Sequence, residues 1–518
     1  MTSQIILFLL GVSAIAGLYV VLRPKRSANS DQTGITTVKS TDDLNRLLDE
    51  GERRVIPESI HKIPRHALDD NAMRVVYRLL DNGYEGYLVG GCVRDLLAGT
   101  EPKDFDVVTS ATPEQTEPLF NNARLIGRRF KIVHVRFGRE IIEVATFRAS
   151  HDSDANSGDQ GKQAASGMLM RDNVYGSLED DALRRDFTIN ALYYNVSDNA
   201  VYDFANGYPD LLAKQIRIIG DAESRYREDP VRMLRAARFA AKLGFEIEKE
   251  TAEPIRRMGS LIAKVSSARM FDEVLKLLQT GYGESCLRQL IRFDLLRFLL
   301  PANDRMLGSD TYPVDALTNN ALRNTDRRLS QGKSVNPAFL FAAMLWYPLV
   351  ERMEKLKDRR DLPPLQRLHE AANQVLAEQV KATAIPRRHS TTIREIWELQ
   401  HRLLRQDHAE RLIEHPRFRA GYDLLVLREE SGEDLNGISR WWTDYQNANP
   451  DTRPKPERTP RRKGPPRNAS FARPRCARRR ESTRGAARHR RCAAAQAQPS
   501  ESSRAPTWHP SAHKRPAH

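Results

Sequence analysis

The stretch Tyr87–Asp106, YLVGGCVRDLLAGTEPKDFD, carries the most informative pattern of the chain. Its apolar start predicts a β-strand, and this strand ends at Gly90 and Gly91. Asp104 and Asp106 open a second apolar run, and because side chains alternate along a strand, both carboxylates are expected on one face. Two carboxylates beside a diglycine turn suit Mg²⁺ and a nucleoside triphosphate, because glycine lets the backbone approach phosphate closely.

Arg94 follows the diglycine in a short helical pattern, where its guanidinium can pair with phosphate oxygens. An Asp-x-Asp pair alone is weak support, since a solvated pair at the start of a strand is the commoner case. The ordered set of a diglycine, an Arg-Asp pair and then Asp-x-Asp is much more specific. Three further motifs occur later in the chain: IEVATFR at Ile142–Arg148, RRDFTINAL at Arg184–Leu192 and EDPVRMLR at Glu228–Arg235.

Together, the four motifs resemble the head-domain signature of the nucleotidyltransferase superfamily. Within it, they are similar to the class II branch, which comprises bacterial poly(A) polymerases and tRNA CCA-adding enzymes. The resemblance runs from about Val55 to about Asn447, which is most of the chain. It implies an α+β fold, in which a nucleotidyltransferase head with a small mixed β-sheet is followed by an all-helical neck and body.

Hydrophobic patterns give the boundaries of these parts. Strand patterns fall within residues 56–220, the expected head, and include a hairpin formed by Lys131–Phe137 and Ile141–Phe147. Beyond the head, apolar residues recur at helical spacing. By the resemblance, residues 221–280 are expected to form the neck and residues 281–448 the body.

The composition of the chain limits its domain number, its metal and disulfide chemistry, and the location of its charge. A chain of 518 residues has room for two or three domains and a sizeable core. Its four cysteines are scattered without a Cys-x-x-Cys pair, which argues against structural zinc and against a disulfide framework. The net charge of +15 is distributed unevenly along the chain. Residues 453–518 contain 19 of the 82 Lys and Arg but only 3 of the 67 Asp and Glu, so the rest of the chain is close to neutral.

Residues 449–518 are expected to form a disordered basic tail. They are rich in Arg, Pro, Ala and Ser and contain too little Leu, Ile and Val to bury a core. Up to Arg491 we interpret this tail as an arm that binds polyanions nonspecifically through phosphate contacts. Beyond Arg491 a solubilising end, or an out-of-frame terminus, is the simpler interpretation.

Residues 4–22 are uncharged and mostly apolar, and they are long enough for one membrane span. Basic residues follow at once, so an anchor here would leave the rest of the chain in the cytoplasm. A start codon placed too early is the alternative origin of residues 1–22. A signal peptide is disfavoured because its positive charge would precede the apolar run. We expect a cytoplasmic protein, tethered to the inner membrane if the anchor is real, with residues 23–55 as a polar linker.

The resemblance assigns roles to the motif residues. Asp104 and Asp106 are expected to hold two Mg²⁺ ions, which activate the primer 3′-OH and steady the leaving pyrophosphate. By resemblance, Asp186 is expected to be the third acidic residue of the active site. The alternative interpretation is that Asp186 belongs to an ion-paired turn at the surface. Glu143 is a second candidate for a catalytic carboxylate and ranks after Asp186. The alternative interpretation is that Glu143 is a solvent-exposed strand residue without a catalytic role. The triphosphate is expected to lie against Gly90, Gly91, Arg94 and Arg185.

The neck helix is expected to open with four charged residues: Glu228, Asp229, Arg232 and Arg235. Residues three or four apart share a helix face, so Asp229 and Arg232 either form an ion pair or read a base edge together. In the second case Asp accepts from an exocyclic amine and Arg donates to a ring nitrogen. In class II relatives this motif selects the incoming nucleotide, and the resemblance favours the same role here.

Polyadenylation is the favoured function, with transfer of AMP from ATP to RNA 3′ ends, release of pyrophosphate and a role in mRNA processing and decay. The segment Leu125–Val135, LIGRRFKIVHV, resembles the one that separates bacterial poly(A) polymerases from CCA-adding enzymes. Addition of CCA to tRNA is the alternative, and an inactive RNA-binding relative is a third, against which the intact acidic motifs argue. The expected partners are ATP and RNA 3′ ends, and we expect a monomer that contacts a membrane only through residues 4–22.

Overall fold

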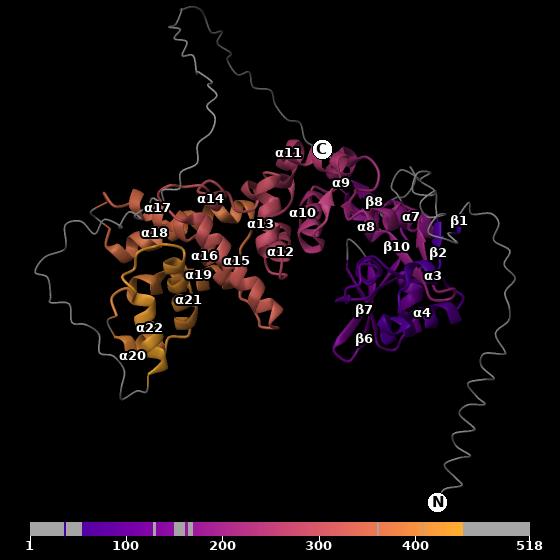
Figure 1. Cartoon of the computed structure of the whole chain (residues 1–518), viewed down its shortest axis with the longest axis horizontal. Coiled ribbons are helices and arrows are strands. Elements are labelled where there is room, and N and C mark those ends of the chain that lie inside the picture. Colours follow the sequence, from indigo (N-terminus) through magenta and orange to yellow (C-terminus); the bar gives the residue numbers. More distant parts are fainter. Residues whose placement is uncertain are drawn as a thin grey trace, which may run out of the picture. The chain divides into compact units, whose positions relative to one another are not determined.

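The computed structural model describes residues 36–37, 54–127, 131–149, 161–163, 169–172, 174–359, 362–406 and 408–448. The apolar segment 4–22 and the tail 449–518 lie outside the described residues, so what the sequence predicts for them stays a prediction. Among the helices that the structure does describe, none has both the length and the apolar character needed to cross a membrane. Figure 1 shows that strands belong mainly to the indigo and purple first part of the chain and that helices follow.

The head is built on a mixed sheet, in which nine strands are described. Their order is β1-β2-β11-β10-β3-β4-β7-β6-β5. β1 pairs with β2 and β4 with β7 in parallel, whereas the other neighbours are antiparallel. The strands are β1 (Thr36–Thr37), β2 (Arg54–Ile56), β3 (Gly86–Val89), β4 (Asp106–Thr109), β5 (Ala123–Ile126), β6 (Ile132–Phe137), β7 (Glu140–Thr146), β10 (Leu192–Asn195) and β11 (Ala200–Asp203).

Short helices and one small strand pair complete the head. The pair consists of β8 (Gly161–Gln163) and β9 (Leu169–Asp172), which run antiparallel. The helices are α3 (Glu58–His61), α4 (Asp70–Asp81), α5 (Gly91–Leu97), α6 (Pro113–Thr116), α7 (Leu178–Leu183) and α8 (Gly207–Leu212). Single-turn 3₁₀ helices lie at Arg65–Ala67, Glu117–Leu119 and Thr188–Asn190.

The side chains of the central strands alternate between two hydrophobic clusters. Leu88 of β3 and Val107 of β4 belong to a cluster that contains the apolar side chains of α4 and α5. The next residues along each strand, Val89 and Val108, pack into a separate cluster on the other face. Because side chains alternate, Asp106 faces away from α4 and α5, on the side where Val108 lies.

Two short pairings involve segments for which the sequence predicts other structure. β1 and most of β2 lie within residues 23–55, the predicted linker, where Arg54 is buried and lies 3.6 Å from Asp203. β12 (Gln215–Ile216) pairs in parallel with β13 (Glu246–Ile247), so the neck contains one short strand. Strands of two or three residues carry no readable period, which is why the hydrophobic pattern misses them.

Helices form the rest of the described chain. They are α9 (Ala222–Glu228), α10 (Val231–Leu243), α11 (Lys249–Met258), α12 (Ser267–Leu278), α13 (Gly283–Arg292), α14 (Pro301–Asp304), α15 (Val314–Ser330), α16 (Pro337–Met344), α17 (Trp346–Lys355), α18 (Pro364–Ala382), α19 (Arg387–Leu403), α20 (Ala409–Ile413), α21 (Phe418–Glu430) and α22 (Ile438–Asn447). Two further 3₁₀ segments lie at Gly259–Lys264 and Leu296–Phe298.

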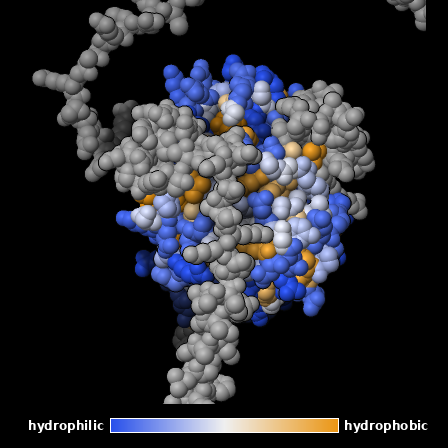
Figure 2. All heavy atoms as spheres, turned by 90° about the vertical axis from the view of Figure 1, so that its right-hand side faces the viewer, coloured by the Kyte–Doolittle hydropathy of each residue, from blue (hydrophilic) through white to orange (hydrophobic). Residues whose placement is uncertain are grey.

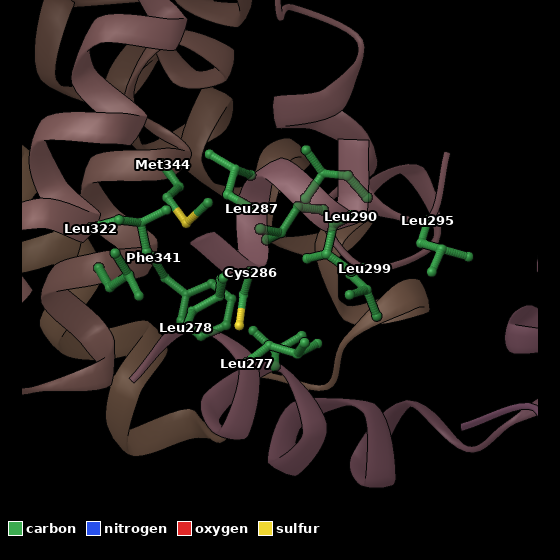
Figure 3. Close-up of a cluster of buried hydrophobic side chains, with 14 of the residues drawn as sticks. Leu277, Leu278, Cys286, Leu287, Leu290, Leu295, Leu299, Leu322, Phe341 and Met344 are labelled. Atoms are coloured by element: carbon green, nitrogen blue, oxygen red, sulfur yellow. The ribbon is translucent and has the colours of Figure 1, made fainter. Parts of the chain in front are cut away.

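One hydrophobic cluster runs through the neck and most of the body. Figure 3 shows part of it, where Cys286 of α13 lies close to Leu277 of α12, and Leu290 of α13 lies close to Leu299. A smaller cluster around Trp442 joins α19 to α22. On the face drawn in Figure 2, hydrophilic side chains cover most of the described surface and hydrophobic ones form small separate patches. The predicted α+β class, with a mixed-sheet head and a helical remainder, is confirmed.

Candidate active site

The diglycine forms the turn between β3 and α5. Gly90 has a φ of 76° and a ψ of −121°, a conformation that any side chain would strain. A Cβ atom built on Gly90 would lie 3.3 Å from Nη1 of Arg185, so this guanidinium lies over the turn. α5 begins at Gly91 without a side-chain cap, which leaves its first N–H groups available to an anion. The turn and Arg185 are therefore suited to hold phosphate.

The two aspartates of the DFD motif stand at the start of β4. Asp104 precedes the strand with 76% of its side chain exposed, and Asp106 is its first residue. In the parallel pairing of β4 with β7, Asp106 lies directly opposite Glu143. Reduced solvation, and then the charges of Glu143 and Asp104, raise the pKa of Asp106 to about 6, although Arg185 opposes the shift. Glu143 therefore belongs to the same acidic face as Asp106.

These carboxylates fit a divalent cation. Mg²⁺ is usually held by one or two carboxylates together with substrate phosphates and water, not by an all-protein cage. In the described part of the chain, no three His, Cys, Asp or Glu side chains surround one point as a ready metal site. Reduced solvation is the main cause of the raised pKa of Asp106, and the charges of Glu143 and Asp104 add to it; a divalent cation would offset both effects. The donor set thus suits Mg²⁺ bound jointly with a triphosphate.

Arg185 is held rigidly between the turn and the neck. Its Nε donates to the Tyr193 hydroxyl at 2.8 Å, and its Nη2 donates to Oδ2 of Asp181 at 2.9 Å. Nearby, burial lowers the pKa of Arg184 to about 9, and the charges of Arg148, Arg185, Arg225 and Arg232 add to this shift. Five arginines thus surround one region of the head and neck. Such a concentration of positive charge favours a polyanion such as a triphosphate.

Asp186 takes part in a head-to-neck ion pair. Its Oδ2 lies 2.5 Å from Arg235 of α10, and its Oδ1 accepts from the backbone N–H of Phe187 at 2.9 Å and from the Asn190 side chain at 3.1 Å. Although burial opposes it, the charge of Arg235 together with these hydrogen bonds lowers the pKa of Asp186 to about 2. Protein groups donate to both carboxylate oxygens of Asp186. A carboxylate that is available to bind a metal ion would have an oxygen without such a donor.

Arg94 lies away from the expected phosphate site. It is buried and donates to Oδ1 of Asp95 and, at 2.7 Å, to Oδ1 of Asn190. Its guanidinium also lies over the ring of Phe239 in α10, 5.2 Å from the ring centroid. These contacts connect α5 to the neck, so Arg94 supports the turn from below and does not face a ligand.

The residues of the EDPVR motif lie at the junction of α9 and α10. Glu228 is paired with Arg232 at 2.6 Å and with Arg225 at 2.9 Å. Asp229 pairs with Arg269 of α12 at 2.7 Å, and therefore not with Arg232. Both Asp229 and Arg232 line a pocket of about 470 Å³ that also includes Arg185, Asp186 and Arg235. Asp229 and Arg232 thus each pair with another residue, and both lie at one pocket.

Three family models match the chain. The Poly A polymerase head domain matches residues 86–217, and a domain described as the probable RNA and SrmB-binding site of polymerase A matches residues 244–307. The polymerase A arginine-rich C-terminus matches residues 360–484. All three descriptions refer to the same kind of polymerase.

Full-length relatives decide the family. Poly(A) polymerase I of Escherichia coli is 48% identical over 423 residues, which cover 79% of this chain and 91% of that protein. Poly(A) polymerase I of Haemophilus influenzae is 46% identical, and the match covers 82% of this chain and 95% of that protein. The chain belongs to the bacterial poly(A) polymerase family.

CCA-adding enzymes are more distant from this member of the poly(A) polymerase family. The CCA-adding enzyme of Bacillus pumilus is 37% identical, but the match covers only 47% of this chain and 58% of that protein. Among solved structures, a CCA-adding enzyme in an apo form has a TM-score of 0.52 with 20% identity, and covers 76% of this chain and 87% of its own. That similarity shows a shared fold.

The structure groups the predicted site residues of this poly(A) polymerase family member into two sets. Asp104, Asp106 and Glu143 lie together on the sheet, close to the diglycine turn. Asp186, Asp229, Arg232 and Arg235 line the neck pocket, and Arg185 belongs to both sets. Arg94 and Glu228 serve other contacts, because the first is buried under the turn and the second is ion-paired beside the pocket.

Sequence reasoning missed four charged residues of α12 that line the pocket. They are Arg269, Asp272, Glu273 and Lys276. A signal was present, because these positions follow helical spacing while Met270, Phe271, Val274 and Leu277 between them are buried. A charged stripe of this kind usually faces water. Only the packing of α12 against α10 places it beside Asp229 in this poly(A) polymerase relative.

Proposed function

We propose that the chain is a polynucleotide adenylyltransferase that adds AMP from ATP to RNA 3′ ends without a template and releases pyrophosphate. The observation that carries this proposal is similarity to poly(A) polymerases through head, neck and body, with every acidic motif residue present. An inactive relative would not need its carboxylates. The biological role that follows is the tailing of RNA in mRNA processing and decay.

We propose Mg²⁺ as the cofactor, held by Asp104 and Asp106 with Glu143 beside them. When bound, two ions would lower the pKa of the primer 3′-OH and stabilise charge on the leaving pyrophosphate. The carboxylates orient the reacting groups, since Asp106 and Glu143 are fixed by the pairing of β4 and β7. Asp186 acts beside them as a positioning residue that fixes α10, and thereby the pocket, against the head.

The incoming nucleotide is proposed to bridge the two sets of residues. Arg185 stands between the diglycine turn and the neck pocket, where it can hold the triphosphate while the base enters the pocket. There Asp229 accepts from the exocyclic amine and Arg232 donates to the ring nitrogen. Adenine and cytosine both present an amine beside a ring nitrogen, so the shape of the pocket must exclude cytosine.

RNA is the proposed second substrate, and the helices within residues 244–307 are candidates for part of its binding surface. We further propose that the chain is a monomer. Light scattering on the purified chain measures this directly. A mass of twice 59.0 kDa would contradict it.

Nucleotide incorporation tests the proposed function. The purified chain is incubated with Mg²⁺, an unstructured RNA and each of the four NTPs in turn. Long tails are expected with ATP, and little incorporation with CTP, GTP or UTP. The Asp229→Ala variant is expected to lose at least tenfold in kcat/KM for ATP, because the base loses one of its two polar contacts.

The CCA-adding alternative is tested with a tRNA that lacks its terminal CCA. Its support is the partial match to CCA-adding enzymes and the two-base ambiguity of the Asp-Arg pair. Addition of two C residues and then one A would establish that activity and overturn polyadenylation. Absence of incorporation with every NTP would instead favour the inactive relative.

A further inference from the structure

A row of polar side chains crosses the head sheet from the acidic site to its edge. Asp106 of β4 lies opposite Glu143 of β7, and Glu143 lies opposite His134 of β6. His134 in turn lies opposite Arg124 of the edge strand β5. Nε2 of His134 is 3.4 Å from Oε1 of Glu143, so the side chains of this row are in contact at its centre. The register therefore connects the carboxylates to a basic residue at the edge.

The face that carries this row is open. Val133 and Val135 of β6, and Val144 of β7, point to the opposite face and are buried. Glu143 is 53% exposed, and Arg124 and Arg136 are exposed as well. Because strand side chains alternate, Arg136 shares the face of His134, two residues away.

Arg124 and Arg136 have no ion-pair partner within the described residues, whereas the exposed Arg227 and Arg257 of the neck both pair with Glu223. Both guanidiniums stand on the face that leads to the acidic site. A polyanion that ends at the carboxylates would supply the missing negative charge.

We infer that the open face of β5 and β6 binds the 3′-terminal segment of the RNA primer, with Arg124 and Arg136 on its phosphates. His134 is a positioning residue between this surface and Glu143. The inference rests on the proposed polyadenylation, and it adds the primer surface that this activity requires.

The position of the surface separates it from nucleotide selection. Neighbouring strands lie about 4.8 Å apart, so Arg124, three strands from Asp106, stands about 14 Å from that residue. The pocket that contains Asp229 and Arg232 includes none of Arg124, His134 or Arg136 among its lining residues. These residues are thus placed to act on the primer upstream of its 3′ end and not on the incoming base.

The same placement gives a role to the segment Leu125–Val135, which resembles poly(A) polymerases and not CCA-adding enzymes. Its residues Leu125 and Ile126 belong to β5, and Ile132–Val135 belong to β6. A tRNA presents a structured acceptor end, whereas polyadenylation requires a grip on single strands of any sequence. Arginine contacts to phosphates provide that grip without reading bases.

The double variant Arg124→Gln/Arg136→Gln tests this inference in the full chain. Loss of two phosphate contacts is expected to raise the KM for RNA at least tenfold and to leave the KM for ATP unchanged. The slope of log Kd against log salt should fall by about 1.4, at about 0.7 for each single-strand phosphate. The control is Arg74→Gln/Arg78→Gln, which removes two exposed arginines from α4 on the opposite side of the sheet. It should match the wild type.

A photo-crosslink locates the RNA independently. An RNA with 4-thiouridine just upstream of its 3′ end is expected to crosslink to peptides of β5 or β6, and less to the double variant. If the wild type is active and the double variant keeps the wild-type KM for RNA, salt slope and crosslink, the proposed primer surface is wrong, but the proposed function still holds. A wild type that binds RNA but incorporates no nucleotide would instead overturn the proposed function.

Discussion

At the scale of single residues, the environment of Asp106 is the most telling feature. Glu143 lies opposite it and Asp104 two residues before it, while Arg185 is the nearby positive charge. Reduced solvation, together with the negative charges of Glu143 and Asp104, makes ionisation of Asp106 costly and raises its pKa. Such an arrangement is explained by a ligand that brings its own positive charge.

Replacement of Asp106 by Ala is expected to lower AMP incorporation by about 10³-fold, because a metal ligand contributes several kcal/mol to the transition state. RNA binding should change less than threefold. The measurement pairs incorporation kinetics with fluorescence anisotropy on the same RNA. Glu101→Ala is the control, since it removes an exposed carboxylate from the same loop. Equal incorporation by Asp106→Ala and the control would rule out the metal-binding role.

At the scale of elements, a few partly buried polar contacts join the head to the neck. Asp186 pairs with Arg235 of α10, and Lys242 near the end of α10 pairs with Asp95 of α5 at 3.0 Å. Phe239 lies between them and contacts the guanidiniums of Arg94 and Arg235. One helix of the neck is therefore fixed to the head at two points, on both sides of an aromatic ring.

The Asp186–Arg235 pair predicts a defined pH dependence of stability. The folded-state pKa of Asp186 is about 2, below its ordinary value of 3.8, so the pair stabilises the fold above about pH 4. The shift corresponds to about 2 kcal/mol, which is lost as the pH falls toward 2. Chemical unfolding of the wild type and of Asp186→Asn should differ by about this amount at pH 7, and the difference should fall to less than half of it by pH 2.5. A constant difference across this range would show that the ion pair is not the cause.

At the scale of the whole molecule, charge is divided between a nearly neutral folded part and a basic tail. Residues 453–518 contain 19 Lys and Arg against 3 Asp and Glu. A neutral body cannot by itself attract RNA over long distances, whereas a basic chain can. Electrostatic attraction and catalysis are thus expected to reside in different parts of the molecule.

Truncation after Asn449 is therefore expected to weaken RNA binding at low salt and to reduce its salt dependence, with kcat unchanged. A control of full length, in which every Lys and Arg of the tail is replaced by Gln, should behave like the truncated chain. An unchanged salt slope in both variants would place the RNA contacts within the head, neck and body.

The sequence by itself determined the family, the order of the parts and the elements with strong local patterns. The strand before the diglycine and the hairpin of β6 and β7 are confirmed, because hydrophobic period and turn residues act over a few neighbours. The acidic pair was readable for the same reason, since Asp104 and Asp106 are separated by a single residue.

Tertiary structure alone decided which distant side chains meet. Glu143 joins Asp106 only through the register of two parallel strands, and Arg269 reaches Asp229 only because α12 packs beside α10. It also placed Arg94 under the turn, although its motif predicts a phosphate contact. Local sequence fixes which side chains share a face of one element. The packing of elements, which depends on many contacts far apart in the chain, decides what those faces meet.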